Sequence, residues 1–228
     1  GSFINLVSAT DIAAGTAGAA FVSDGNIQLS DFDSSAQTGP GLINFHADFN
    51  GDGSGTFVPV GSAVLNLGAA EVEIIADDID LNGTASVTGT NRLKILAGAA
   101  VTSFGVGEAG DMTLDAAEIA KISDGFLVGW TLSNGNAGGA LNIGATTFSD
   151  PIEFLATAAG GNINVNGTLI GTGDADFFFD GPGATTTLNA DIITSGNSVT
   201  ISDSVVLGSP ASVTIDTTNA GAVGTGAG

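Results

Sequence analysis

One short stretch places oxygen-bearing side chains at the alternating positions that a Ca²⁺ loop uses. Asp48, Asn50, Asp52 and Ser54 occur with glycines between the last three. Carboxylate, amide and hydroxyl oxygens at this spacing correspond to the first half of an oxygen-ligated calcium loop. Residues 57–59 read Phe-Val-Pro where the closing acidic ligand should come. The stretch therefore predicts a Ca²⁺ site, and an Asx/Gly turn between two strands is the competing interpretation.

Two further groups of carboxylates lie later in the chain: Asp77, Asp78 and Asp80, then Asp174, Asp176 and Asp180. Paired carboxylates can bind Ca²⁺ or serve as the acid pair of a polysaccharide hydrolase. The alternative is a solvated turn that keeps strand edges soluble. The chain contains an internal repeat, in which residues 79–98 align with residues 163–182. In this second copy the position of Asp77 and Asp78 becomes Ala/Gly-rich, which favours the turn.

The few basic residues offer little for catalysis. Arg92 and Lys94 alternate on one expected strand, as the base of a lyase acting on acidic polysaccharide would require. Their counterparts in the second copy are Asp176 and Phe178. His46, the only histidine, is expected to face outward from a strand, and no serine has the histidine partner that a triad needs. The sequence predicts a protein that is not an enzyme.

The composition excludes several classes of function. The 228 residues include 24 acidic and 3 basic ones, for a net charge of −21, so a nucleic-acid-binding surface is excluded. Such a charge attracts cations and keeps a glycine-rich chain soluble. Apolar residues come in short packets, so we expect no membrane-spanning helix. The absence of Cys excludes disulfides, and the composition suits an exported bacterial protein.

An internal repeat organises the chain. Residues 79–98 align without a gap with residues 163–182, residues 72–76 with 152–156, and residues 65–69 with 141–145. Self-similarity of this kind indicates stacked repeats. Short apolar alternations between Gly, Asn and Asp turns predict many short strands. The expected strands are Ile4–Val7, Asn26–Leu29, Leu42–Phe45, Phe57–Val60, Ala63–Leu67, Val72–Ile75, Ile79–Leu81, Arg92–Leu96, Ala140–Ile143, Ile152–Leu155, Asn162–Val165, Asp176–Phe179, Thr185–Leu188, Ser198–Ile201 and Ser212–Ile215.

Among sandwich, barrel and solenoid, the repeat favours an all-β parallel β-helix, or β-solenoid, in which like positions stack from coil to coil. Leu81 and Val165, or Leu93 and Phe177, should then occupy equivalent inward positions. Spacings of about 13 to about 25 residues between apolar packets predict a coil length in the upper part of that range. Phe177–Phe179 cannot all point inward, so Phe178 or a neighbour should be exposed.

A short helix should interrupt the strands near residues 115–124. Asp115 and Glu118 have the spacing of a capping box, and Gly125 is suited to end the helix. Leu114, Ile119 and Ile122 would form its buried stripe. We expect residues 3–228 to be one domain from a longer repeat array, because neither end resembles a cap, and Gly1-Ser2 to be a cloning scar.

Residues 105–175 resemble a repeat of the giant, filamentous-haemagglutinin-like surface adhesins of cyanobacteria, green sulfur bacteria and planctomycetes. The shared motifs are glycines 105, 107 and 110, then Leu114, Glu118-Ile119, Asp124-Gly125-Phe126 and residues 139–144. The last part of the chain is also similar to these proteins, so the resemblance covers about residues 60–220. It implies a right-handed parallel β-helix and supplies no ligand.

This resemblance implies a structural or adhesive segment of a large bacterial surface protein, outside the cell and associated with the outer membrane. The segment would be a stiff spacer or a contact surface, with another surface protein, a polysaccharide or neighbouring repeats of its own chain as partner. The alternative is a β-helix enzyme or binding module that acts on extracellular polysaccharide. No cofactor other than Ca²⁺ is expected.

Overall fold

The computed structural model describes residues 3–6, 10–11, 18–36, 41–136, 138–157, 160–209 and 212–218. These residues form strands β1 to β26 and a short helix, α1, so the expected all-β class is confirmed. The chain divides into unit 1, residues 1–101 with 117–131, and unit 2, residues 102–116 with 132–228. Helix α1 (Ala116–Ile119) and strand β15 (Gly129–Asn134) each cross this division. The single domain expected for residues 3–228 stays a prediction.

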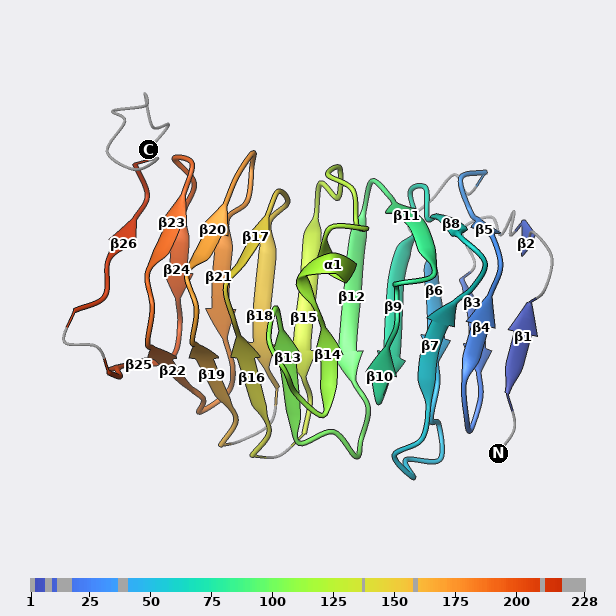
Figure 1. The fold of residues 1–228 in the computed structure, drawn as a ribbon, viewed down its shortest axis with the longest axis horizontal. Coiled ribbons are helices and arrows are strands. Elements are labelled where there is room, and N and C mark those ends of the chain that lie inside the picture. The colour runs from blue at the N-terminus through green and yellow to red at the C-terminus, as the bar shows by residue number, and fades with distance from the viewer. Residues whose placement is uncertain are drawn as a thin grey trace. The chain divides into compact units, whose positions relative to one another are not determined.

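Unit 1 contains parallel strands from three sheets, A, B and C, which the chain visits in turn (Figure 1). We call three successive strands, one from each sheet, a coil. The strands of sheet A are β1 (Ile4–Leu6), β4 (Ile27–Leu29), β7 (Thr56–Pro59) and β10 (Asp78–Ile79). Those of sheet B are β2 (Thr10–Asp11), β5 (Phe32–Asp33), β8 (Ala63–Asn66) and β11 (Thr84–Thr88). Those of sheet C in unit 1 are β3 (Ala19–Val22), β6 (Leu42–His46), β9 (Glu71–Ala76) and β12 (Arg92–Ala97).

From residue 140 onward, unit 2 follows the same rule with sheets D, E and C, whereas its first two strands both lie in sheet D. Sheet D contains β13 (Ser103–Val106), β14 (Met112–Leu114), β16 (Ala140–Ile143), β19 (Asn162–Val165), β22 (Thr185–Leu188) and β25 (Ser204–Leu207). Sheet E contains β17 (Thr146–Phe148), β20 (Leu169–Gly171), β23 (Ile192–Thr194) and β26 (Ile215–Asp216). The strands of sheet C that lie wholly in unit 2 are β18 (Ile152–Ala156), β21 (Phe177–Asp180) and β24 (Val199–Ile201).

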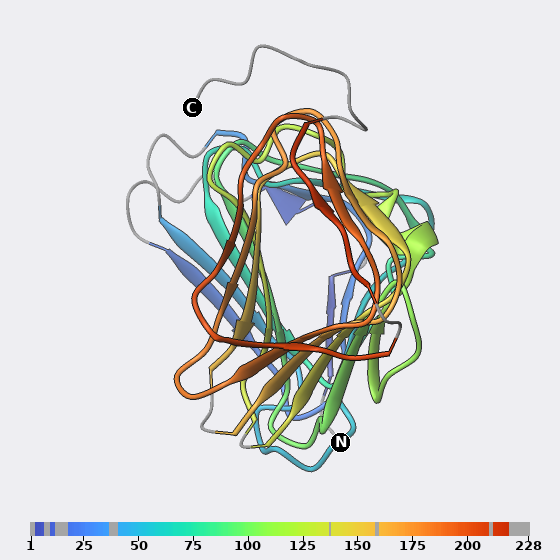
Figure 2. The same cartoon turned by 90° about the vertical axis from the view of Figure 1, so that its left-hand side faces the viewer.

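Neighbouring coils are joined by side-chain ladders as well as by strand pairing. In unit 2, Asn164 bonds Asn142, 22 residues earlier, and Asn189 bonds Asn166, 23 residues earlier. The expected coil length is therefore confirmed there. Figure 2 shows the strands of unit 2, yellow to red, around a common interior. Side chains such as those of Phe154 and Phe179 are fully buried there.

Like residues stack in the interior because parallel pairing keeps one register from coil to coil. In unit 1, Val72 lies between Ile43 and Leu93. In unit 2, the rings of Phe154 and Phe179 stack with centroids 5.1 Å apart. Leu81, Val165, Leu93 and Phe177 are all buried, as expected. Phe178 is half-buried between two buried neighbours, so the three phenylalanines do not all point inward, but none of them is exposed as predicted.

The helix is shorter than predicted. It ends at Ile119, and Ile122 forms a parallel bridge with Val87 instead of continuing the helix. The backbone N–H of Val87 donates to Lys121 (2.9 Å) and that of Ser123 donates to Val87 (2.9 Å). These bonds engage backbone groups that a longer helix would need for itself. Gly125, with φ 137°, therefore lies beyond the helix rather than at its end.

Gly1 and Ser2, interpreted as a cloning scar, lie outside the described residues, as does Val7 of the first expected strand. Among the described residues, no helix has the length and apolar character needed to cross a membrane.

Candidate functional site

The residues predicted to bind Ca²⁺ lie in the loop after β6, residues 48–55. Asp48 has a φ of 58°, a left-handed conformation that aspartate tolerates better than most residues. Its side chain is buried and accepts hydrogen bonds from the backbone N–H groups of Asp52 (2.9 Å) and Gly53 (3.0 Å). Asp48 therefore folds the loop around its own carboxylate.

The other three predicted ligands bond to one another at the surface of this loop. The Asn50 amide donates to Asp52 Oδ2 (2.9 Å), and the Ser54 hydroxyl donates to Asp52 Oδ1. Both bonds hold the pKa of Asp52 below its ordinary value, and the bond from Ser54 has the larger effect. The structure brings the four predicted residues together, as the Ca²⁺ interpretation requires, and equally satisfies the Asx/Gly turn. The Ca²⁺ site stays a prediction.

A carboxylate that the sequence did not connect with this loop is Asp77, in the turn between β9 and β10. Its Oδ2 accepts from Gly55 N (3.0 Å), and Asp77 N donates back to Gly55 O (2.8 Å). Its carboxyl lies within hydrogen-bonding reach of the Asp48 carboxyl. Burial first, and then the contact with Asp48, raise the pKa of Asp77 to about 6. The loop thus meets an acidic group from the following coil.

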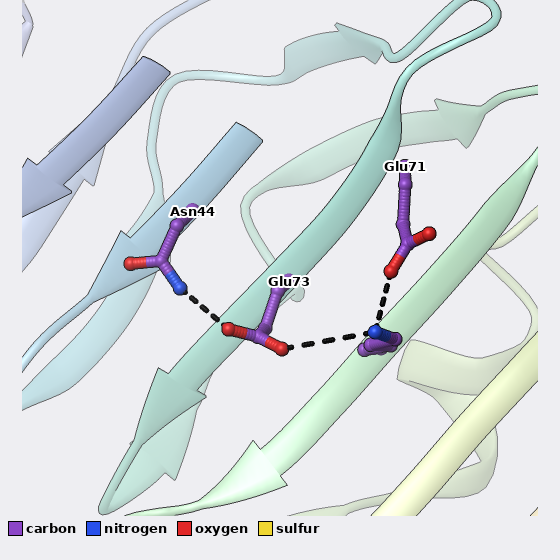
Figure 3. Close-up of polar contacts among 4 residues, drawn as sticks. Asn44, Glu71 and Glu73 are labelled. Atoms are coloured by element: carbon purple, nitrogen blue, oxygen red, sulfur yellow. Dashed lines mark hydrogen bonds and ion pairs between the residues drawn. The ribbon is translucent and has the colours of Figure 1, made fainter. Parts of the chain in front are cut away.

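The outer face of sheet C in unit 1 carries a second polar cluster, formed by Asn44, Glu71, Glu73 and Lys94 (Figure 3). Strands β6, β9 and β12 alternate buried residues with these outward ones. The Asn44 amide donates to Glu73 Oε1 (2.7 Å). Lys94 Nζ pairs with Glu71 and lies 4.0 Å from Glu73 Oε2. Side chains from three coils therefore form one connected network.

Two of the three basic residues of the chain lie on this face, because Arg92 and Lys94 alternate with buried residues along β12. His46 ends the same face at the end of β6, half-buried and outward as expected, and its ring packs edge-on against Phe49 (5.2 Å). Phe49 is 62% exposed. The face thus combines an amide, paired charges and an aromatic ring.

The acidic group of Asp174, Asp176 and Asp180 lies in turns of unit 2. Asp176 Oδ1 accepts from the backbone N–H (2.5 Å) and hydroxyl (2.8 Å) of Ser198, and Asp180 Oδ1 accepts from Gly181 N (2.9 Å). Carboxylate oxygens of Asp174 and buried Asp150 lie within 4.8 Å of each other. The bonds of Asp176 and Asp180 are those expected of structural turn residues.

Asn166, which is followed by Gly167 and Thr168, lies in a turn whose contacts join neighbouring coils. Its amide donates to Glu108 Oε1 (2.8 Å) and its oxygen accepts from Asn189 (2.9 Å). A Cβ at Gly167 would meet Ala145 N at 2.1 Å, so only glycine fits this close approach of two coils. These contacts agree with a turn.

Comparison with known proteins gives no match: no protein family, no curated protein and no solved structure matches this chain.

Proposed function

We propose that this chain is a right-handed parallel β-helix segment of a large bacterial cell-surface protein of the filamentous-haemagglutinin-like kind. It acts outside the cell as a stiff spacer or as a contact surface in adhesion. The supporting observation is the in-register stacking of like residues in successive coils of parallel strands. Each coil is supported by its neighbours, which is how a repeat array gains rigidity.

The contact surface of this proposal is the outer face of sheet C in unit 1. Side chains on adjacent parallel strands are about 4.8 Å apart, so rows of polar groups run across the strands. Asn44, Glu73 and Lys94 form one such row. Their amide, carboxylate and ammonium groups can bond the hydroxyls of a glycan, and exposed Phe49 can pack against the apolar face of a sugar ring. This row favours a polysaccharide-binding module as the particular form of adhesion.

A neutral glycan fits this face better than an acidic one. The face carries equal numbers of acidic and basic groups, Glu71 and Glu73 with Arg92 and Lys94, whereas the whole chain has a net charge of −21. An anionic polysaccharide would be repelled by the surrounding field.

The proposal is tested by binding of beads coated with the protein to immobilised neutral and acidic polysaccharides. We expect binding to a neutral glycan that the double variant Asn44→Ala, Lys94→Ala abolishes. Asn164→Ala is the matched control, because Asn164 makes a similar ladder bond (2.8 Å) in unit 2. Equal binding by all three proteins would place the contact elsewhere. Release of new reducing ends from the glycan would favour the enzyme alternative.

A further inference from the structure

Two Asn-Gly-Thr sequences occupy matching places of the internal repeat, residues 82–84 and residues 166–168. In both, the asparagine is exposed and the glycine is half-buried. The hydrogen bonds that surround them differ. We propose that Asn82 is a site of spontaneous deamidation, and that the fold protects its counterpart Asn166 from the same reaction.

Deamidation of an Asn-Gly pair needs only water as a co-reactant. The backbone nitrogen of the glycine attacks the side-chain amide carbon of the asparagine, so that a new C–N bond forms and the bond from Cγ to Nδ2 breaks. The leaving nitrogen takes the proton of the glycine N–H and departs as ammonia, which leaves a cyclic imide. Water then opens the imide at either carbonyl and gives aspartate or isoaspartate. Glycine favours the attack because it has no side chain to restrict the backbone.

The attacking nitrogen is free in the turn that contains Asn82. This turn is closed by the bond from Thr84 N to Leu81 O (2.8 Å), and the N–H of Gly83 has no acceptor among the described residues. The Asn82 amide and backbone N–H both donate to Asp80 Oδ1, each at 3.0 Å. These bonds are exposed and local, so the side chain can turn toward Gly83 without separating two coils.

Asn166 has neither of these freedoms. The N–H of Gly167 donates to Ile143 O in the previous coil (3.1 Å), so the attacking nitrogen is engaged. The Asn166 amide donates to Glu108 Oε1 (2.8 Å), and its oxygen accepts from Asn189 in the next coil (2.9 Å). The reaction at Asn166 therefore requires that bonds between neighbouring coils break first.

The other two Asn-Gly pairs of the chain, residues 50–51 and residues 134–135, are also held. Gly51 N donates to Asp48 O (3.0 Å). Asn134 is buried, and its amide donates to Ala140 O (3.0 Å). Of the four pairs, Asn82 and Gly83 are therefore the one that combines an exposed amide with a free glycine N–H.

The modification would act on the joint between β10 and β11. Both products place a new carboxylate beside that of Asp80, and isoaspartate also lengthens the main chain by one carbon. The turn has little room for the longer chain, because Gly83 O accepts from Ala63 N (3.2 Å) and a Cβ at Gly83 would meet Pro59 O at 2.5 Å. Deamidation at Asn82 should therefore weaken the pairing of β11 with β8.

The test is peptide mapping by mass spectrometry after incubation at mildly alkaline pH. In the folded protein, we expect Asn82 to react at least about tenfold faster than Asn166, because breaking one hydrogen bond to a charged group already costs this factor. In guanidinium chloride the two sites should react at similar rates, since their sequences match. Asn82→Gln should not be modified, because glutamine would have to form a larger ring, and after incubation it should have a higher Tm than the natural protein.

Equal rates at the two sites of the folded protein, or a faster reaction at Asn166, would overturn the proposal. So would an Asn82 that reacts in guanidinium chloride and stays intact in the folded protein. Modification at Asn82 without a fall in Tm relative to the incubated Asn82→Gln variant would contradict the effect on the joint.

Discussion

At the scale of single residues, exposed aspartates hold the turns of this chain through backbone bonds. Asp111 Oδ2 accepts from Thr102 N and Ser103 N, both at 3.1 Å, and from the Thr102 hydroxyl. These bonds lower the pKa of Asp111, and the bond from the Thr102 hydroxyl has the largest effect. A lowered pKa contributes stability that is present above the ordinary value and is lost as the pH falls through the folded value.

Asp111→Asn should therefore lower Tm at neutral pH, and the difference from the natural protein should shrink on acidification. Thermal unfolding at a series of pH values checks this. Asp24→Asn, at another exposed aspartate, controls for the loss of one charge. A deficit that persists in strong acid would mean that the amide disturbs the turn sterically.

The residues of the candidate site were only partly accessible to sequence reasoning. Asp48, Asn50, Asp52 and Ser54 share one loop because they are neighbours in the chain, so spacing alone located them. Asp77 joins Asp48 only because the strand register brings the β9–β10 turn beside the loop. The network of Asn44, Glu73 and Lys94 depends on the same register. A single sequence did not determine that register.

At the scale of elements, the interior stacks should carry much of the stability. Phe179 is fully buried, stacks on Phe154 and lies beside Ile201 in the next coil. Phe179→Ala should cost about 3–5 kcal/mol, the usual penalty for emptying such a site. Urea unfolding measures it, with exposed Thr200→Ala as the control on the adjacent strand. A cost below about 1 kcal/mol would show that this stack is not well packed.

The polar ladder of unit 2 gives a second element-scale prediction. Asn166→Asp would remove the donor to Glu108 and place a second negative charge beside it. We expect a loss of about 1 kcal/mol at neutral pH, measured by urea unfolding, since a bond to a charged group is replaced by repulsion at an exposed site. Adding Glu108→Gln should restore most of it, because the glutamine amide can donate to the introduced carboxylate. If the double variant is no better than the single one, the ladder bond is not responsible.

Strand length did not decide which strands were predictable: β15, six residues long and buried along its whole length, was not among the expected strands. Ala140–Ile143 and Asn162–Val165 match the structure because each contains a clear apolar alternation. Thr185–Leu188 also matches, with buried Thr186 in the inward place of an apolar residue. Strands such as β5 (Phe32–Asp33) are too short to show a period. The repeat alignment of residues 79–98 with 163–182 was correct, because β10, β11 and β12 correspond in order to β19, β20 and β21. It was misplaced upstream, where residues 65–69 belong to a second strand of a coil and residues 141–145 to a first.

At the scale of the whole molecule, Ca²⁺ binding would appear as added stability. If the 48–55 loop binds the ion as its sequence predicts, millimolar Ca²⁺ after chelation should raise Tm by mass action. Asp52→Asn should remove the rise, because Asp52 is the exposed carboxylate of the loop. An unchanged Tm in the natural protein would contradict the site and leave the Asx/Gly turn.

In unit 2, equivalent residues of two successive coils are 22 residues apart in the sequence, and this coil length has a mechanical consequence. Each coil advances its stack by one strand spacing, about 4.8 Å, whereas the same chain drawn straight spans roughly 70 Å. If the chain is the surface segment proposed above, its folded coils hold a large reserve of length. Under tension, such a coil would peel from the end of its stack and lengthen the tether by roughly 65 Å, absorbing a sudden load before the attachment fails.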